Sequence, residues 1–96
     1  MELRNTVKLD KLKLTDLSFS KKDVLNDRTE KFIRNFELNR ALRLGNTYKH
    51  SVHIYFINAL GEQMETEGTI WAVTEKYIML KGGNTIPIRA ISKVDL

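Results

Sequence analysis

The chain has 96 residues, of which 42% are hydrophobic and 29% charged, a composition typical of one small globular domain. Its longest uncharged apolar stretch, Ser51 to Gly61, is too short to span a membrane, and the lack of cysteine excludes disulfides and thiolate metal sites. The net charge is +4, and the first fifty residues hold twelve of the sixteen lysines and arginines, so any polyanion is expected to bind mainly there.

The first segment, residues 1–20, carries apolar residues in pairs two positions apart, such as Val7 and Leu9. This partial alternation predicts an extended arm that contributes at most one strand. The polar character of its first residues does not resemble a secretory signal. Together with the absence of cysteine, it predicts a cytoplasmic protein.

A helix is predicted over residues 27–43, with Gly45 as its stop. Several residues are candidate caps at its start, namely Ser20 with Asp23, Asn26 and Asp27. Its apolar residues fall on two nearly opposite sides, Phe32, Ile33 and Phe36 on one, Leu38, Ala41 and Leu42 on the other. We therefore expect either a bend near residues 36–39 or a helix covered on both sides.

From about Tyr48 the pattern changes to the two-residue period of strands. Five strands are predicted, at residues 52–57, 64–74, 77–81, 85–89 and 90–94. Gly68 lies in the middle of the second and suits a sharp bend or bulge. The predicted fold is mostly β with an N-terminal helix and a small, strongly bent, five-stranded antiparallel barrel at residues 48–95. Residues 21–96 then form one domain, preceded by the arm.

Alternation along these strands also predicts which side chains are buried. We expect a common core from one face, made of Ile54, Phe56, Ile70, Ile78, Leu80 and Ile88. The opposite face then carries His53, Tyr55, Trp71, Tyr77 and Met79. A face this apolar must be covered by the arm, by a partner subunit or by stacked bases.

Residues with catalytic chemistry are few. His50 and His53 are predicted to point to opposite faces, which does not suit a shared metal, and Glu65 and Glu67 share a strand face without a nucleophile nearby. Gly82-Gly83 precedes a strand instead of a helix, so it is a turn and not a phosphate loop. We therefore expect no enzyme, no cofactor, no metal and no small-molecule substrate.

Four stretches resemble the Sm-like family, and specifically its bacterial Hfq branch. They are residues 38–43 (LNRALR), 52–58 (VHIYFIN), 68–81 and 88–94 (IRAISKV), within about residues 36–96. The resemblance implies an Sm-like, or SH3-like, barrel that binds RNA and forms rings by pairing its fourth strand with the fifth of the next subunit. Pro87 in the fourth strand has no N–H for such pairing.

The positions that correspond to the base pocket of the family differ here. Thr74 stands at the place of an acidic residue, Lys76 at that of a base-stacking aromatic, and only Arg89 keeps a basic side chain in the segment before Ala90. The resemblance therefore implies an RNA-binding protein with a degenerate base pocket. Such a protein would bind single-stranded RNA weakly, through basic residues.

Two functions follow from these observations. In the first, RNA is held by eight residues, with phosphate contacts from Arg40, Arg43, Lys49, Lys76 and Arg89 and base stacking on Tyr55, Trp71 and Tyr77. In the second, the same fold is a protein-interaction or self-association module, such as a homo-oligomer, that does not bind nucleic acid. The basic helix favours the first, and the near-neutral strand region favours the second.

Overall fold

The computed structural model describes residues 7–8 and 18–96 of the chain. Within them the protein is mostly β with one helix, α1 (Arg28–Tyr48). None of the helices in the described ranges is long and apolar enough to cross a membrane. Most of the predicted arm, residues 1–20, lies outside the described residues. Its described part includes β1 (Val7–Lys8), which pairs in parallel with β3 (Gln63–Gly68).

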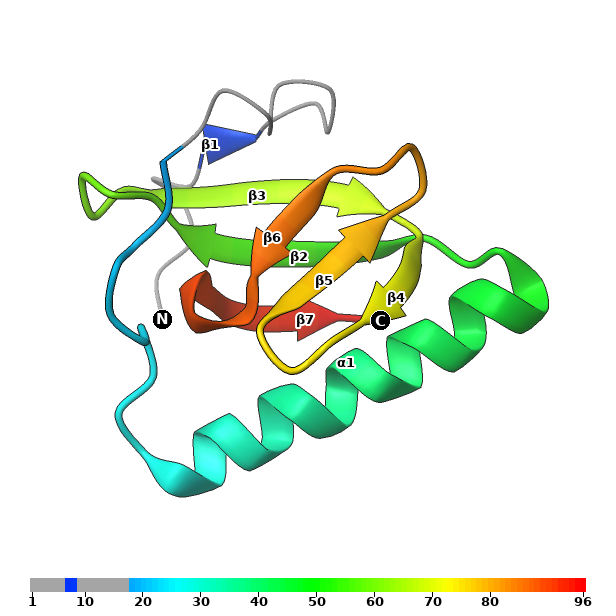
Figure 1. The fold of residues 1–96 in the computed structure, drawn as a ribbon, viewed down its shortest axis with the longest axis horizontal. Helices are drawn as coiled ribbons and strands as arrows, with labels where there is room; N and C mark the ends of the chain where they lie inside the picture. Colours follow the sequence, from blue (N-terminus) through cyan, green and yellow to red (C-terminus); the bar gives the residue numbers. More distant parts are fainter. Residues whose placement is uncertain (1–6, 9–17) are drawn as a thin grey trace.

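The strands form two small sheets that α1 crosses on one side (Figure 1). The first sheet has the order β1-β3-β2-β7, with β2 at Val52–Ile57 and β7 at Ile91–Asp95. The second has the order β4-β5-β6, with β4 at Ile70–Val73, β5 at Tyr77–Leu80 and β6 at Thr85–Pro87. Apart from β1, all pairs are antiparallel. A short 3₁₀ helix, η2 (Ile88–Ala90), joins β6 to β7.

The predicted antiparallel strands are present, but they form two sheets and not the predicted five-stranded barrel. The predicted second strand divides at Thr69 into β3 and β4, which belong to different sheets. Gly68 stands at this division, in agreement with the bend expected there. In the described chain β6 and β7 are not paired with each other, because η2 carries the backbone from one sheet to the other. The ladder of hydrogen bonds therefore stays open.

The open edge of β6 explains the place of Pro87. Asn84 and Ile88 direct their hydrogen bonds toward β5, since Leu80 N–H donates to Asn84 O (2.8 Å) and Ile88 N–H donates to Lys76 O (2.9 Å). Peptide groups alternate in direction along a strand, so the nitrogen of Pro87 faces away from β5. The missing donor is therefore on the outer edge, where it costs nothing inside the sheet and weakens any strand added there.

The helix begins as predicted and ends later. Asp27 is the N-cap and accepts a hydrogen bond from the Thr29 amide (3.1 Å). Gly45 does not stop the helix, which continues to Tyr48 and is capped by Lys49 in the left-handed region (φ 54°). Gly45 instead lets the helix approach β4, because a Cβ there would lie 2.5 Å from the carbonyl oxygen of Ile70. Its role is close packing.

This close approach gives a first prediction. Gly45→Ala is expected to lower the free energy of unfolding by about 1–3 kcal/mol, because the added methyl group meets backbone that cannot move aside. Asn46→Ala, at the next and exposed position, is the control and should change it by less than about 0.5 kcal/mol. Urea unfolding of both variants measures the difference. A Gly45→Ala variant as stable as the parent would show that the helix does not rest on β4.

The core agrees with the prediction. The six residues expected to be buried together are all in one cluster, where they pack with Leu38 and Ala41 of α1. The other predicted apolar side of the helix is different. Phe32, Ile33 and Phe36 are 71%, 52% and 54% exposed, so the described residues cover the helix on one side only.

The segment before the helix is tied to the sheets. The Ser20 amide donates to Ile57 O (3.1 Å), and the Arg89 side chain returns a bond from its Nε to Ser20 O (2.8 Å). Further on, Arg34 reaches back from α1 to Asp23 with two parallel hydrogen bonds of 2.9 and 2.8 Å, and donates to Ile91 O (3.0 Å). These bonds attach residues 18–27 to β2, η2 and β7.

Candidate nucleic-acid interface

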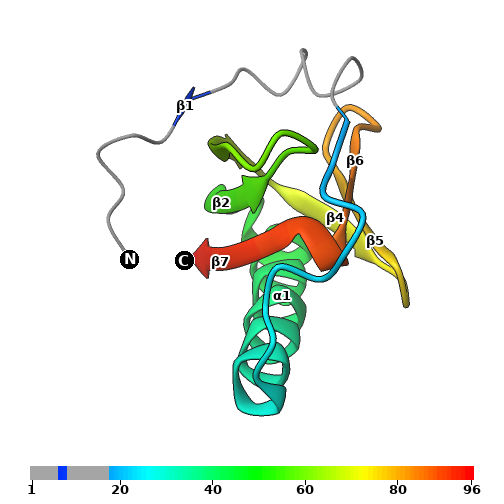
Figure 2. The ribbon, with the colours of Figure 1, turned by 90° about the vertical axis from the view of Figure 1, so that its left-hand side faces the viewer.

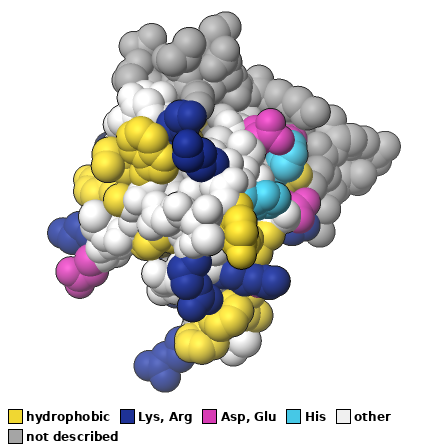
Figure 3. Space-filling view, turned by 90° about the vertical axis from the view of Figure 1, so that its right-hand side faces the viewer, with side chains coloured by type: hydrophobic (Ala, Val, Ile, Leu, Met, Phe, Trp, Pro, Cys, Tyr) yellow, Lys and Arg dark blue, Asp and Glu magenta, His cyan; other side chains and the backbone are white. Residues whose placement is uncertain are grey.

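The end of α1 and the start of β4 form one end of the molecule. Gly45 packs on the backbone of Ile70, and the Lys81 amide donates to Thr69 O (2.8 Å), which brings the β5–β6 hairpin to the same place. Figure 3 shows this end: Lys, Arg and hydrophobic side chains gather there side by side, with His and acidic side chains along one border. The fold thus concentrates charges from distant parts of the sequence.

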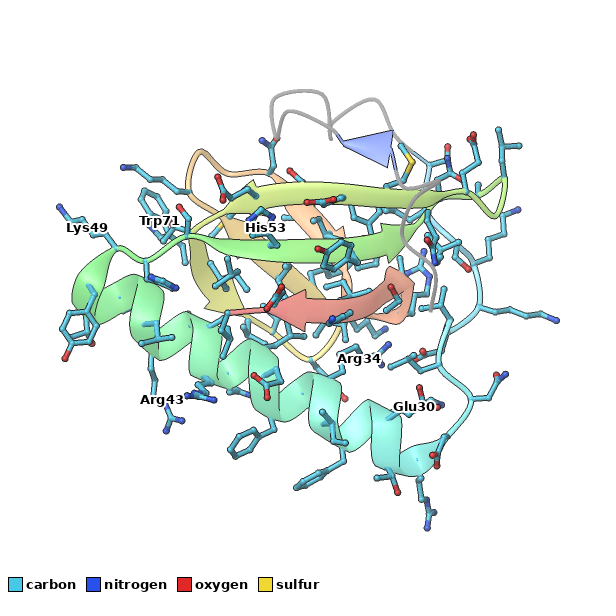
Figure 4. The ribbon with its side chains drawn as sticks, turned by 180° about the vertical axis from the view of Figure 1, so that it is seen from behind. Glu30, Arg34, Arg43, Lys49, His53 and Trp71 are labelled. Atoms are coloured by element: carbon cyan, nitrogen blue, oxygen red, sulfur yellow. The ribbon has the colours of Figure 1, made fainter. Side chains whose placement is uncertain are left out.

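Five exposed residues make up this surface, which we name the basic–aromatic end: Arg43, Tyr48, Lys49, Trp71 and Lys81. Trp71 is 49% and Tyr48 75% exposed. Figure 4 shows Lys49 and Trp71 at the same end of the molecule, with Arg43 on the adjoining part of α1. Three cations beside two exposed aromatic rings combine phosphate contacts with surfaces for base stacking.

The acidic side chains at the border of this end contact a histidine. The ring of His53 lies between two carboxylates, with Nδ1 3.1 Å from Glu65 Oε1 and Nε2 3.0 Å from Glu67 Oε2. Because β2 and β3 are neighbours, this contact links their outer faces across the sheet. The sequence analysis placed Glu65 and Glu67 on one strand face and His53 on the face of another strand, and it missed that they face each other.

Lys76 and Arg89 come together elsewhere. They line a cavity of about 450 Å³ with Lys21, Asp23 and Glu75, on the side of the second sheet away from the basic–aromatic end. Arg89 is held there by its bond to Ser20 O, so part of its donor capacity serves the fold. Arg34 lines this cavity as well, so its lining holds four cations and two carboxylates, and the charge of Arg34 is paired with that of Asp23.

Arg40 belongs to a third place. It lines a groove of about 470 Å³ between α1 and β7, together with Glu30, Ile33, Glu37 and residues 92–96. Acidic side chains on both sides of it distinguish this groove from the basic–aromatic end. Arg40 and Arg43 are three positions apart on one helix, yet Arg40 faces these carboxylates.

The remaining two aromatic candidates are separate again. Tyr55 lies on the outer face of the first sheet, with Lys93 Nζ 5.9 Å from the centre of its ring. Burial raises the pKa of its hydroxyl, and the nearby carboxylates of Glu65 and Asp95 raise it further. Tyr77 is 44% exposed on the outer face of the second sheet, beside an apolar pocket of about 320 Å³ that Ala72 and Met79 also line.

Of the eight residues predicted from the sequence, the structure therefore brings three together at the basic–aromatic end: Arg43, Lys49 and Trp71. Sequence reasoning missed Tyr48 and Lys81. A signal existed for Lys81, because a lysine directly before the Gly82-Gly83 turn is exposed at a hairpin. Tyr48 was read as the start of the strand region, whereas it is the last residue of α1.

Among the residues that the structure describes, no group of three or more His, Asp or Glu side chains is arranged to hold a metal ion. Comparison with family models, with characterised proteins and with solved structures gives no significant match to this chain.

Proposed function

We propose that the chain is a cytoplasmic, Sm-like RNA-binding protein that holds single-stranded RNA at the basic–aromatic end. The observation that carries this proposal is the half-exposed Trp71 at the same end as Arg43 and Lys49 (Figure 4), where the bond of the Lys81 amide to Thr69 O also brings Lys81. The order of elements, one helix followed by bent antiparallel strands, supports an Sm-like architecture, as does the resemblance of residues 36–96. A tryptophan that belonged to the core would be buried, whereas the indole of Trp71 is half exposed.

Binding at this end rests on phosphate contacts. Each lysine or arginine that neutralises a phosphate releases a counterion, so affinity falls as salt rises. Trp71 and Tyr48 offer faces on which any base can stack, since stacking needs no specific hydrogen bonds. The residues that line the cavity at Lys76 and Arg89 include no aromatic ring, so this cavity offers no surface for base stacking. The expected binding is weak, salt-sensitive and nearly independent of sequence.

Variants at the basic–aromatic end test this assignment. Lys49→Ala combined with Lys81→Ala is expected to remove about two phosphate contacts and to flatten the log–log salt slope by about 1.4, at about 0.7 per contact on a single strand. The matched control is Lys93→Ala, which removes a charge on the outer face of the first sheet and should leave the slope unchanged. Anisotropy of a labelled single-stranded RNA across a salt series gives the slopes. Equal slopes in all three proteins would place the RNA elsewhere.

A second candidate, a module that binds protein or itself, is favoured by one specific observation. The outer side of α1 exposes three large apolar residues in a row, Phe32, Ile33 and Phe36. Exposed apolar patches of this kind mark protein interfaces. RNA binding and self-association use different surfaces, so the two functions do not exclude each other.

A further inference from the structure

The outer side of α1 lacks a partner within the described chain. We name the row of Phe32, Ile33 and Phe36 the apolar stripe. All three side chains are more than half exposed, while Leu38 and Ala41 on the opposite side of the helix are fully buried. The helix is therefore apolar on two sides and packed on one. A stripe of two phenylalanines and an isoleucine in water is typical of a surface that another protein covers.

The described parts of the N-terminal region do not lie on the stripe. β1 pairs with β3 at the edge of the first sheet that lies opposite β7, whereas α1 packs against β4 and β7 (Figure 2). Residues 18–27 run along β2 and η2 to the start of the helix. Among the described residues nothing covers the stripe, which leaves it open to another molecule.

Charged residues beside the stripe point to what that molecule is. Glu30, Ile33, Glu37 and Arg40 form one row along the helix and line the groove toward β7. Their spacings of three, four and three residues read the same in both directions. An antiparallel second helix of the same sequence in this register places Glu30 against Arg40 twice, and Ile33 beside Glu37. A parallel copy would place Glu30 against Glu30 and Arg40 against Arg40, which is repulsive.

We propose that a second copy of this chain covers the apolar stripe, through an antiparallel contact of the two α1 helices about a two-fold axis. The contact is isologous, because each helix presents the same row to the other. Its apolar centre supplies the affinity, and the two Glu30–Arg40 pairs fix the direction. Pro87 weakens strand addition at the outer edge of β6, so this helix contact does not depend on pairing of sheet edges.

The proposed dimer places the two basic–aromatic ends far apart. Each lies at the C-terminal end of α1, and antiparallel helices point these ends in opposite directions. A dimer would thus contact RNA at two separate points, which raises apparent affinity for long strands without a new contact. The dimer itself stands without RNA binding, since its contacts involve the stripe and not that end.

Mass measurements on the full chain test the dimer. Sedimentation equilibrium from about 1 to about 100 µM is expected to show a monomer–dimer equilibrium, a range typical of a small interface. Phe32→Ser and Phe36→Ser should each raise the dissociation constant by at least about thirtyfold. Both side chains are exposed in the monomer, so the variants keep the fold, which circular dichroism verifies. Tyr48→Ser, an exposed aromatic outside the stripe, is the control and should leave dimerisation unchanged.

A charge exchange tests the direction of the contact. Glu30→Arg alone and Arg40→Glu alone should each weaken the dimer, because each creates two like-charge contacts. The double variant restores both pairs in reverse and should recover dimerisation. A chain that stays monomeric throughout, a dimer that survives both serine variants, or a double variant weaker than either single one would overturn the proposal. So would loss of RNA binding in the serine variants at unchanged mass, because the stripe would then be a base-stacking surface.

Discussion

Replacing Asp23 by alanine is expected to lower the free energy of unfolding by about 3–5 kcal/mol, the usual cost of leaving a buried charge without its partner. The Arg34 side chain is only 5% exposed and receives its counter-charge from Asp23 through two hydrogen bonds. Its Nε already has no partner among the described residues. Without the carboxylate, the guanidinium would keep a single bond to Ile91 O. Glu75→Ala, which removes an exposed carboxylate, is the control.

The pH dependence of this loss follows from the pKa of Asp23. Burial raises the pKa, but hydrogen bonds from Arg34 and from the Leu25 amide, with the positive charge of Arg34, lower it below its usual range. A carboxyl group with a lowered pKa in the folded state stabilises the fold fully above its unfolded pKa of about 3.9, and the stabilisation is lost as pH falls through the folded pKa. The difference between parent and Asp23→Ala should therefore be full at neutral pH and shrink in acid. Urea unfolding at several pH values measures it, and a difference independent of pH would contradict the ion-pair account.

The second large effect is expected in the core. Ile78→Ala should lower the free energy of unfolding by about 2–5 kcal/mol, because the side chain is fully buried between the sheets and its removal leaves a cavity. Thr85→Ser, at an exposed position of the neighbouring strand β6, is the control and should stay within about 0.5 kcal/mol. Chemical unfolding gives both values. A loss under about 0.5 kcal/mol at Ile78 would mean that this side chain does not contribute to the core.

The strands and the core were predictable because apolar and polar residues alternate along a strand as its side chains alternate between the buried and the exposed face. Ile54 and Phe56 are buried, and Tyr55 between them is not, as the two-residue period indicates. Pairing between distant strands has no such local signal. The sequence around Gly68 therefore predicted a bend. It did not predict that the chain would pass there from one sheet to the other.

The helix was harder to predict for a similar reason. A glycine near the end of a helical pattern most often ends the helix. The residues around Gly45 in the sequence do not indicate its contact with Ile70. Phe32 and Phe36 were expected to be covered, because apolar side chains on a helix usually face a core. Their exposure means that no described residue packs on this side of the helix, and the sequence pattern has no signal for such a missing contact.

The candidate site was predictable in its residue types and less so in its grouping. Arg43 and Lys49 were identified because they end the basic helix, and Trp71 because it alternates with core residues. Lys81 joins them only through the fold, by the bond of its amide to Thr69 O. Arg89 shows the reverse case, since the side chain of this basic residue donates one hydrogen bond within the fold, to Ser20 O.

The central claim, that the basic–aromatic end binds single-stranded RNA, is tested most directly through Trp71. It is the only tryptophan of the chain, so tryptophan fluorescence, excited at wavelengths that tyrosine does not absorb, reports on this end alone. Titration with uridine, adenosine and mixed oligonucleotides across a salt series should quench the signal with weak affinity, little difference between sequences and a linear loss on log–log axes. Absence of quenching and binding at low salt would contradict the claim and leave the protein-binding function. Tight binding confined to uridine tracts would contradict it as well, because recognition would then lie in a base pocket.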